Sequence, residues 1–101
     1  MIRVVALYKQ PEDVEGFMRH YEEVHTPLVR KIPGLAGLEV TRITADAFGG
    51  EAPYFLMAVM TFPDRETFDA AMRSEENRAV AKDVMGFARG LVTVMVGEDV
   101  E

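Results

Sequence analysis

The chain has 101 residues, no cysteine and a formal net charge of −6 at pH 7. This length fits one domain over residues 1–101, and the lack of cysteine excludes disulfides, thiolate nucleophiles and cysteine-ligated metal sites. The acidic balance and the scattered basic residues argue against nucleic acid as a partner. The N-terminal residues lack a signal-peptide pattern and no apolar run reaches membrane-spanning length, so we expect no membrane association and a cytoplasmic protein.

Strand signals and helix signals alternate along the chain. The predicted elements are a strand over Ile2–Tyr8, a helix from about Pro11 to Lys31 that is bent or restarted at Thr26–Pro27, strands over Leu35–Thr44 and Tyr54–Phe62, a helix capped by Asp64, a helix over Glu75–Ala88 capped by Ser74, and a strand over Leu91–Val96. The order βαββαβ is that of a ferredoxin-like sandwich. We therefore predict an α+β fold whose four-stranded antiparallel sheet has the first and third strands in its centre.

Both faces of the predicted sheet are apolar. The strand Tyr54–Phe62 is apolar at nearly every position, whereas the helical segments can cover only one face. A bare apolar face is unusual for a monomer, so we predict a homodimer in which two sheets close a dimeric α+β barrel. A monomer whose polar loop Ala45–Pro53 folds over the sheet is the alternative, and higher oligomers stay open.

The first predicted helix carries an ionisable group on its apolar side. At the helical period that side comprises Val14, Phe17, Met18, Tyr21, Val24, His25 and Leu28. Burying an unpaired polar group costs about 1 to 3 kcal/mol, so His25 needs a partner or a wet cavity. Two interpretations stay open: a catalytic base at the end of a cavity between helix and sheet, or a structural histidine bonded to a backbone carbonyl.

Other chemistries find little support. The two histidines, His20 and His25, are five residues apart, which on an α-helix turns their rings roughly 140° from each other, so we expect no metal site and place His20 at the rim or surface. The single serine, Ser74, fits a helix cap, and no glycine-rich phosphate loop is present. The candidate ligand-binding residues beside His25 are Tyr21, Phe17, Tyr8 and Met57.

Three stretches resemble the EthD family of small dimeric α+β barrel proteins, over nearly the whole length. They are Tyr8-Lys9-Gln10-Pro11, the pattern F-x3-Y-x3-H-x-P-L over Phe17, Tyr21, His25, Pro27 and Leu28, and Ile32-Pro33-Gly34-Leu35. The family takes its name from bacterial gene clusters for the degradation of ethyl tert-butyl ether, where it accompanies an oxygenase system. The resemblance implies a ligand between helices and sheet, with His25 facing it.

Related barrels isomerise muconolactones, cyclise or oxidise polyketides without cofactors, or degrade haem. The haem-degrading branch relies on asparagine, tryptophan and histidine, and this chain has no tryptophan and only Asn77, so haem is disfavoured. We expect no cofactor. The first hypothesis is a cofactor-free acid–base catalyst, or an accessory factor, in the degradation of a small hydrophobic organic compound. The second is a binding module that delivers an apolar metabolite to a partner oxygenase. A third is an oligomerisation domain with a solid core.

Overall fold

The computed structural model describes all 101 residues and has the predicted topology. The strands are β1 (Ile2–Tyr8), β2 (Gly37–Arg42), β3 (Leu56–Phe62) and β4 (Val92–Glu98), in the order β2-β3-β1-β4 with every neighbouring pair antiparallel. The helical segments are α1 (Val14–His20), a π-helical turn (Tyr21–His25), α2 (Thr26–Arg30), α3 (Arg65–Met72) and α4 (Glu75–Phe87). The ferredoxin-like α+β fold is thus confirmed. None of the helices is both long and apolar enough to cross a membrane.

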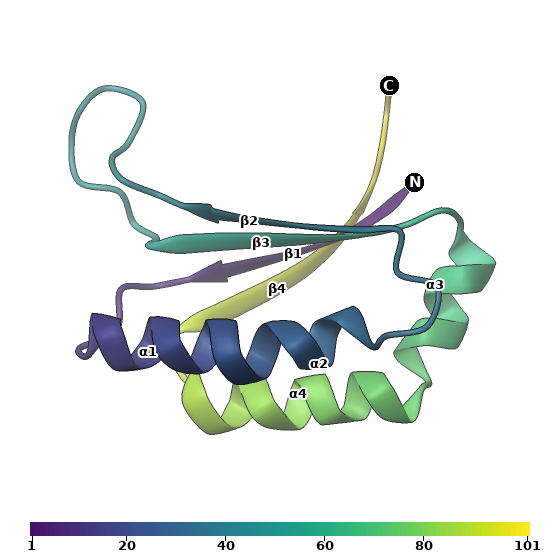
Figure 1. Cartoon of the computed structure of the whole chain (residues 1–101). Helices are drawn as coiled ribbons and strands as arrows, with labels where there is room; N and C mark the ends of the chain where they lie inside the picture. The colour runs from purple at the N-terminus through teal and green to yellow at the C-terminus, as the bar shows by residue number, and fades with distance from the viewer.

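All helices lie on one face of the sheet, and the other face is open (Figure 1). Side chains alternate along a strand, and Val4, Ala6 and Ala58 line a cavity on the helix side. The pairing register therefore places a second apolar set on the open face, comprising Val5, Leu7, Met57, Val59 and Met95. The loop between β2 and β3 rises away from this face in Figure 1 and does not cover it, and its Phe48 is 99% exposed.

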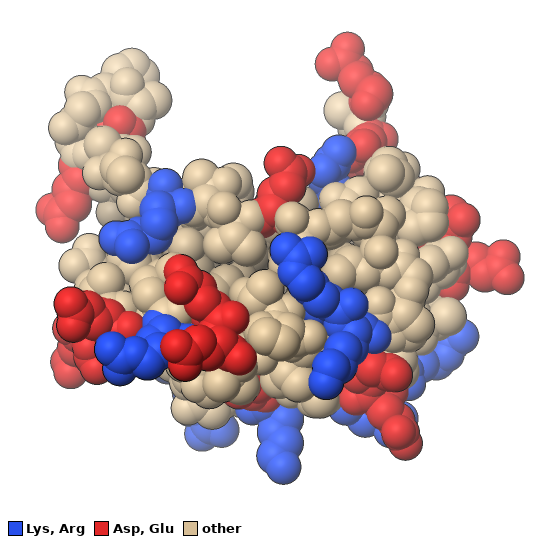
Figure 2. Space-filling model, in the orientation of Figure 1, with Lys and Arg blue, Asp and Glu red and all other residues tan.

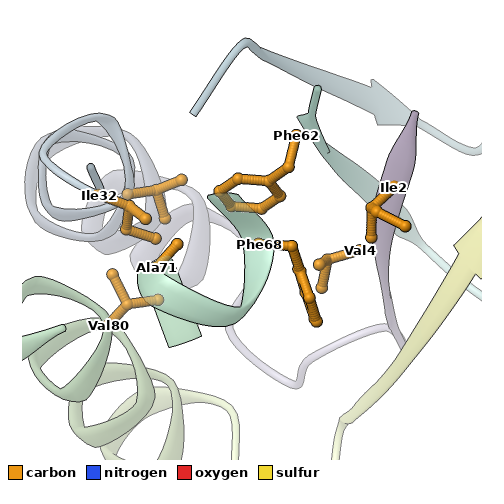
Figure 3. Close-up of a cluster of buried hydrophobic side chains, with 8 residues drawn as sticks. Ile2, Val4, Ile32, Phe62, Phe68, Ala71 and Val80 are labelled. Atoms are coloured by element: carbon orange, nitrogen blue, oxygen red, sulfur yellow. The ribbon is translucent and has the colours of Figure 1, made fainter. Parts of the chain in front are cut away.

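The main core lies between the helices and the covered face of the sheet (Figure 3). Its buried members are Ile2, Val4, Val29, Ile32, Phe62, Phe68, Ala71 and Val80. A second buried cluster, at the other end of the sheet, contains four aromatic residues: Tyr8, Phe17 and Tyr21 contact one another, and Phe55 contacts Phe17. The charged residues stay outside, and Figure 2 shows acidic and basic side chains interspersed over the visible face.

Helix caps fix the helix boundaries. The carboxylate of Asp64 accepts a hydrogen bond from the Thr67 amide at 2.8 Å, and the Ser74 hydroxyl accepts one from the Asn77 amide at 3.1 Å, as predicted. The first helix begins at Val14 and not at Pro11, because the Asp13 side chain caps it.

The first helix departs from α-helical geometry just before Pro27. The Thr26 amide donates to the Tyr21 carbonyl five residues back, which defines a π-helical turn. Pro27 has no amide to donate to the carbonyl four residues before it, and its ring would clash with that carbonyl in a regular α-helix. The widened turn rotates Val24 outward, so this residue is 41% exposed, contrary to the prediction that it faces the core.

Candidate functional site

A carboxylate from α4 joins the two histidines of the first helix. Nδ1 of His25 lies 2.9 Å from one oxygen of Asp83, and Nε2 of His20 lies 2.8 Å from the other. The side chain of His25 is 4% exposed and that of Asp83 is 16% exposed, whereas that of His20 is 34% exposed. The three groups form one hydrogen-bonded chain that runs from the interior to the surface, and we call it the histidine–aspartate network.

The π-helical turn brings the two histidines to the same side. The prediction that their rings point roughly 140° apart assumed α-helical geometry and is wrong, because bonding to the fifth residue back stacks residues five apart one turn above each other. His20 is nevertheless partly exposed, as a rim residue would be. The chain contains no group of three or more histidine, cysteine, aspartate or glutamate side chains arranged to hold a metal ion.

Burial determines the charge of His25, and the network determines its tautomer. Burial lowers the pKa of His25, although the hydrogen bond and negative charge of Asp83 oppose this shift, so the imidazole is neutral at pH 7. An ionised carboxylate can only accept, so Nδ1 carries the proton and Nε2 carries the lone pair. Nε2 has no hydrogen-bond partner in the protein, and it is not among fully buried atoms that lack one. Because His25 lines a cavity, Nε2 is its nitrogen available to a ligand there.

This cavity has a volume of about 200 Å³ and lies between the helices and the covered face of the sheet. Apart from His25 and Asn77 its walls are apolar or aromatic: Val4, Ala6, Tyr8, Tyr21, Val29, Leu38, Ala58, Met60, Met72, Val80, Ala81, Val84 and Val94. Of the candidate ligand-binding residues, Tyr8 and Tyr21 line it, whereas Phe17 and Met57 do not. Phe17 packs behind the two tyrosines, and Met57 lies on the open face of the sheet.

The two tyrosines add protonated hydroxyl groups to the site. Burial raises the pKa of Tyr21 to about 12, an effect that its hydrogen bond with Tyr8 partly offsets, and burial likewise raises the pKa of Tyr8. Their rings meet edge to face with centroids 5.6 Å apart, and the Tyr21 ring lies 5.3 Å from that of His25. Both hydroxyls therefore stay neutral at physiological pH, and because one donates to the other, one O–H proton of the pair remains to donate to a ligand.

Residues 9–90 of the chain match the sequence model of a protein family, the EthD domain. The chain belongs to the EthD family. A crystal structure of an ethyl tert-butyl ether degradation (EthD) family protein from Bacillus halodurans superposes with a TM-score of 0.93, at 46% identity, covering 99% of each chain. An uncharacterised 11.0 kDa protein of Rhodococcus erythropolis, from the thcB–thcC intergenic region, is 31% identical over 98% of this chain and 95% of its own length.

More distant structures show how widely the EthD fold is shared. SnoaB of Streptomyces nogalater, a cofactor-independent oxygenase, has a TM-score of 0.71 at 10% identity and covers 99% of this chain and 93% of its own. Ferredoxin-like proteins described as dimeric come from Bacteroides fragilis and Thermobifida fusca, at 16% and 17% identity. At these identities the likeness establishes the fold alone.

In this EthD-family chain the residue that sequence reasoning missed is Asp83. Its position follows the helical period of the α4 side that faces the cavity, between Val80 and Val84, where a carboxylate is as unexpected as a histidine. The same signal that singles out His25, an ionisable group within an apolar stripe, was therefore present 58 residues further along.

Proposed function

We propose that this EthD-family protein is a cofactor-free acid–base catalyst that transfers a proton on a small apolar organic compound. One observation carries the proposal. Nδ1 of His25 lies 2.9 Å from a carboxylate oxygen of Asp83, and its Nε2, which has no partner in the protein, belongs to a residue that lines an apolar cavity. A histidine whose tautomer and orientation are fixed by a carboxylate is an arrangement suited to general base catalysis.

The proposed step is balanced within one compound. Nε2 of His25 takes a proton from a C–H or O–H group that a neighbouring carbonyl or aromatic ring makes acidic, and His25 becomes an imidazolium. The carboxylate of Asp83 stabilises that cation through the Nδ1–H bond. Return of the proton to another atom of the same compound gives an isomer and restores the neutral histidine. Because the two tyrosine hydroxyls are hydrogen-bonded to each other, one O–H proton of the pair would donate a hydrogen bond to an oxygen of the ligand.

The cavity limits the size of the ligand. An engineered apolar cavity of about 150 Å³ in another protein binds benzene, so about 200 Å³ suits one ring with small substituents. Phenols, small lactones and compounds derived from short ethers fall in this range. The description of the Bacillus halodurans relative as an ethyl tert-butyl ether degradation family protein supports a small organic substrate.

The competing proposal is a binding module that passes an apolar compound to a partner oxygenase. The composition of the cavity wall supports this binding module, because apart from His25 the wall has only the two tyrosines and Asn77 as polar groups. Binding of an apolar compound needs no further polar groups. In that case His25 only hydrogen-bonds the ligand. The homodimer is part of both proposals, because each leaves the open sheet face to a second copy.

A ligand screen followed by a turnover assay separates the two proposals. Thermal shift measurements on the wild type would cover muconolactones, phenols, quinones, short tertiary ethers, aldehydes and haem, because a bound ligand stabilises the folded state. Each ligand that binds is then incubated in D₂O, and deuterium incorporation and product are measured by NMR. The variant is His25→Gln, and the matched control is Glu23→Gln on the exposed side of the same turn.

We expect a ligand that binds both proteins, with deuterium incorporation or product formation at least about 100-fold slower in His25→Gln, since a positioned base contributes on the order of 10² to 10⁴ in rate. Glu23→Gln should behave as the wild type. Binding without any exchange or turnover in the wild type would overturn the catalyst in favour of the binding module. If no compound bound, both proposals would fail and the oligomerisation domain would replace them.

A further inference from the structure

We propose that His20 is a positioning residue: it fixes the carboxylate of Asp83 so that this carboxylate holds His25 in the tautomer with Nε2 free. The inference rests on the proposed role of His25 as the base. It adds a residue to the site that lies outside the cavity and does not touch the ligand.

The two oxygens of Asp83 divide between the two histidines. Nε2 of His20 lies 2.8 Å from Oδ1 and 3.1 Å from Oδ2, and Nδ1 of His25 lies 2.9 Å from Oδ2. The carboxylate has no lysine or arginine partner, since the arginines in ion pairs contact Asp99 and Glu98. Without His20 one side of the carboxylate is free to turn toward water, which reaches 16% of this side chain. Only His20 opposes that rotation from outside.

A third aromatic ring closes the network from the side. The Phe87 ring has its centroid 4.5 Å from that of His20 and 5.1 Å from that of His25. This packing shields one side of the hydrogen bonds from water, and a charge-assisted bond in partly buried surroundings is stronger than one in solvent. The outer histidine can therefore restrain the carboxylate that the inner histidine uses.

His20 also lies where it can stay in exchange with solvent. It lines a surface groove formed by the start of α1 and the end of α4, which includes Glu12, Asp13 and Arg89 as its charged members. The cavity that His25 lines is a different hollow, and the two share no residue. The role of His20 is thus exerted through Asp83 and not through the ligand.

The test reads the tautomer of His25 directly. Nitrogen-15 NMR of histidine-labelled protein at about pH 7.5, above the pKa of His25, distinguishes a proton on Nδ1 from one on Nε2. The variants are His20→Phe, which keeps a ring against Phe87 but has no N–H, and His20→Gln, which keeps a donor without a charge. Asp83→Asn is the positive control, because its amide can donate to Nδ1 and favour the other tautomer. Arg19→Gln, an exposed neighbour, is the matched control.

We expect the proton of His25 to stay on Nδ1 in the wild type, in His20→Gln and in Arg19→Gln, and to appear on Nε2 in a large fraction of His20→Phe. If His20→Phe does not fold, His20→Ala replaces it, and we expect the same appearance of the proton on Nε2 of His25. An unchanged tautomer in the variants without a donor, with or without a loss of stability, would overturn the proposal and leave His20 as a purely structural contact between α1 and α4.

The tautomer measurement needs no ligand, so its outcome is independent of the catalytic proposal. If a substrate is found, His20→Phe should lower kcat at least about tenfold with KM little changed, and His20→Gln should restore most of it, because a wrong tautomer removes the base without removing binding. If His25→Gln left turnover intact, His25 would not be the catalytic base. The NMR spectrum would still show whether His20 positions His25.

Discussion

At the scale of single residues, the environment of His25 makes stability depend on pH. Burial dominates over the nearby carboxylate and lowers the pKa of His25 below its value of about 6.5 in the unfolded chain. Between the folded and the unfolded pKa the unfolded chain therefore binds more protons than the folded one. The free energy of unfolding rises with pH in this window, so the contribution of His25 is complete above about pH 6.5 and is lost as the pH falls below it.

We predict that urea denaturation midpoints of the wild type fall between about pH 7.5 and pH 5.5, and that His25→Gln shows a shallower dependence because it has no imidazole to titrate. The lower end of this pH range lies above the pH at which most carboxylates titrate, so their protonation contributes little. All samples have the same protein concentration, because the stability of a dimer depends on concentration. Equal slopes for the two proteins would mean that the pKa of His25 is the same in the folded and the unfolded state.

At the scale of elements, local signals in the sequence predicted the fold well and the site only in part. The strand and helix order follows from periodicity, and the caps at Asp64 and Ser74 follow from residue type, because both depend on near neighbours. The π-helical turn depends on Pro27 and on a packing partner far along the chain, and a reading at 3.6 residues per turn cannot detect it. The hydrogen bond between His25 and Asp83 is a tertiary contact, and it forms only when α4 packs against the first helix.

The cap of α4 gives a prediction at the same scale. The Ser74 hydroxyl accepts from the Asn77 amide at 3.1 Å and donates to the Ala71 carbonyl at 2.6 Å, so it links the end of α3 to the start of α4. Ser74→Ala should lower the free energy of unfolding by about 1 kcal/mol, as measured by urea denaturation, and Ser74→Thr should recover most of the loss. A loss of stability equal in both variants would show that the hydroxyl is not the stabilising group.

At the scale of the whole molecule, one sheet serves two purposes on its two faces. The covered face holds the cavity and His25, while the open face presents Val5, Leu7, Met57, Val59 and Met95 with no helix over them. The loop before β3 and the C-terminus both extend to the open side in Figure 1. A second copy on this face would bury the apolar side chains without obstructing the cavity.

The open face therefore carries the last prediction. Val59 lies on the central strand β3, between Val5 of β1 and Glu39 of β2, so Val59→Lys places a charge in the middle of the proposed dimer interface. Val40→Lys is the matched control. Val40 pairs with the buried Ala58, so it lies on the helix side of the sheet, and it is 42% exposed.

Analytical ultracentrifugation should find the wild type and Val40→Lys dimeric and Val59→Lys monomeric, since burying an unpaired charge is costly. A dimer of unchanged affinity in Val59→Lys would show that the copies meet elsewhere. A monomer that still binds the ligand of the wild type would show that the cavity is complete within one subunit.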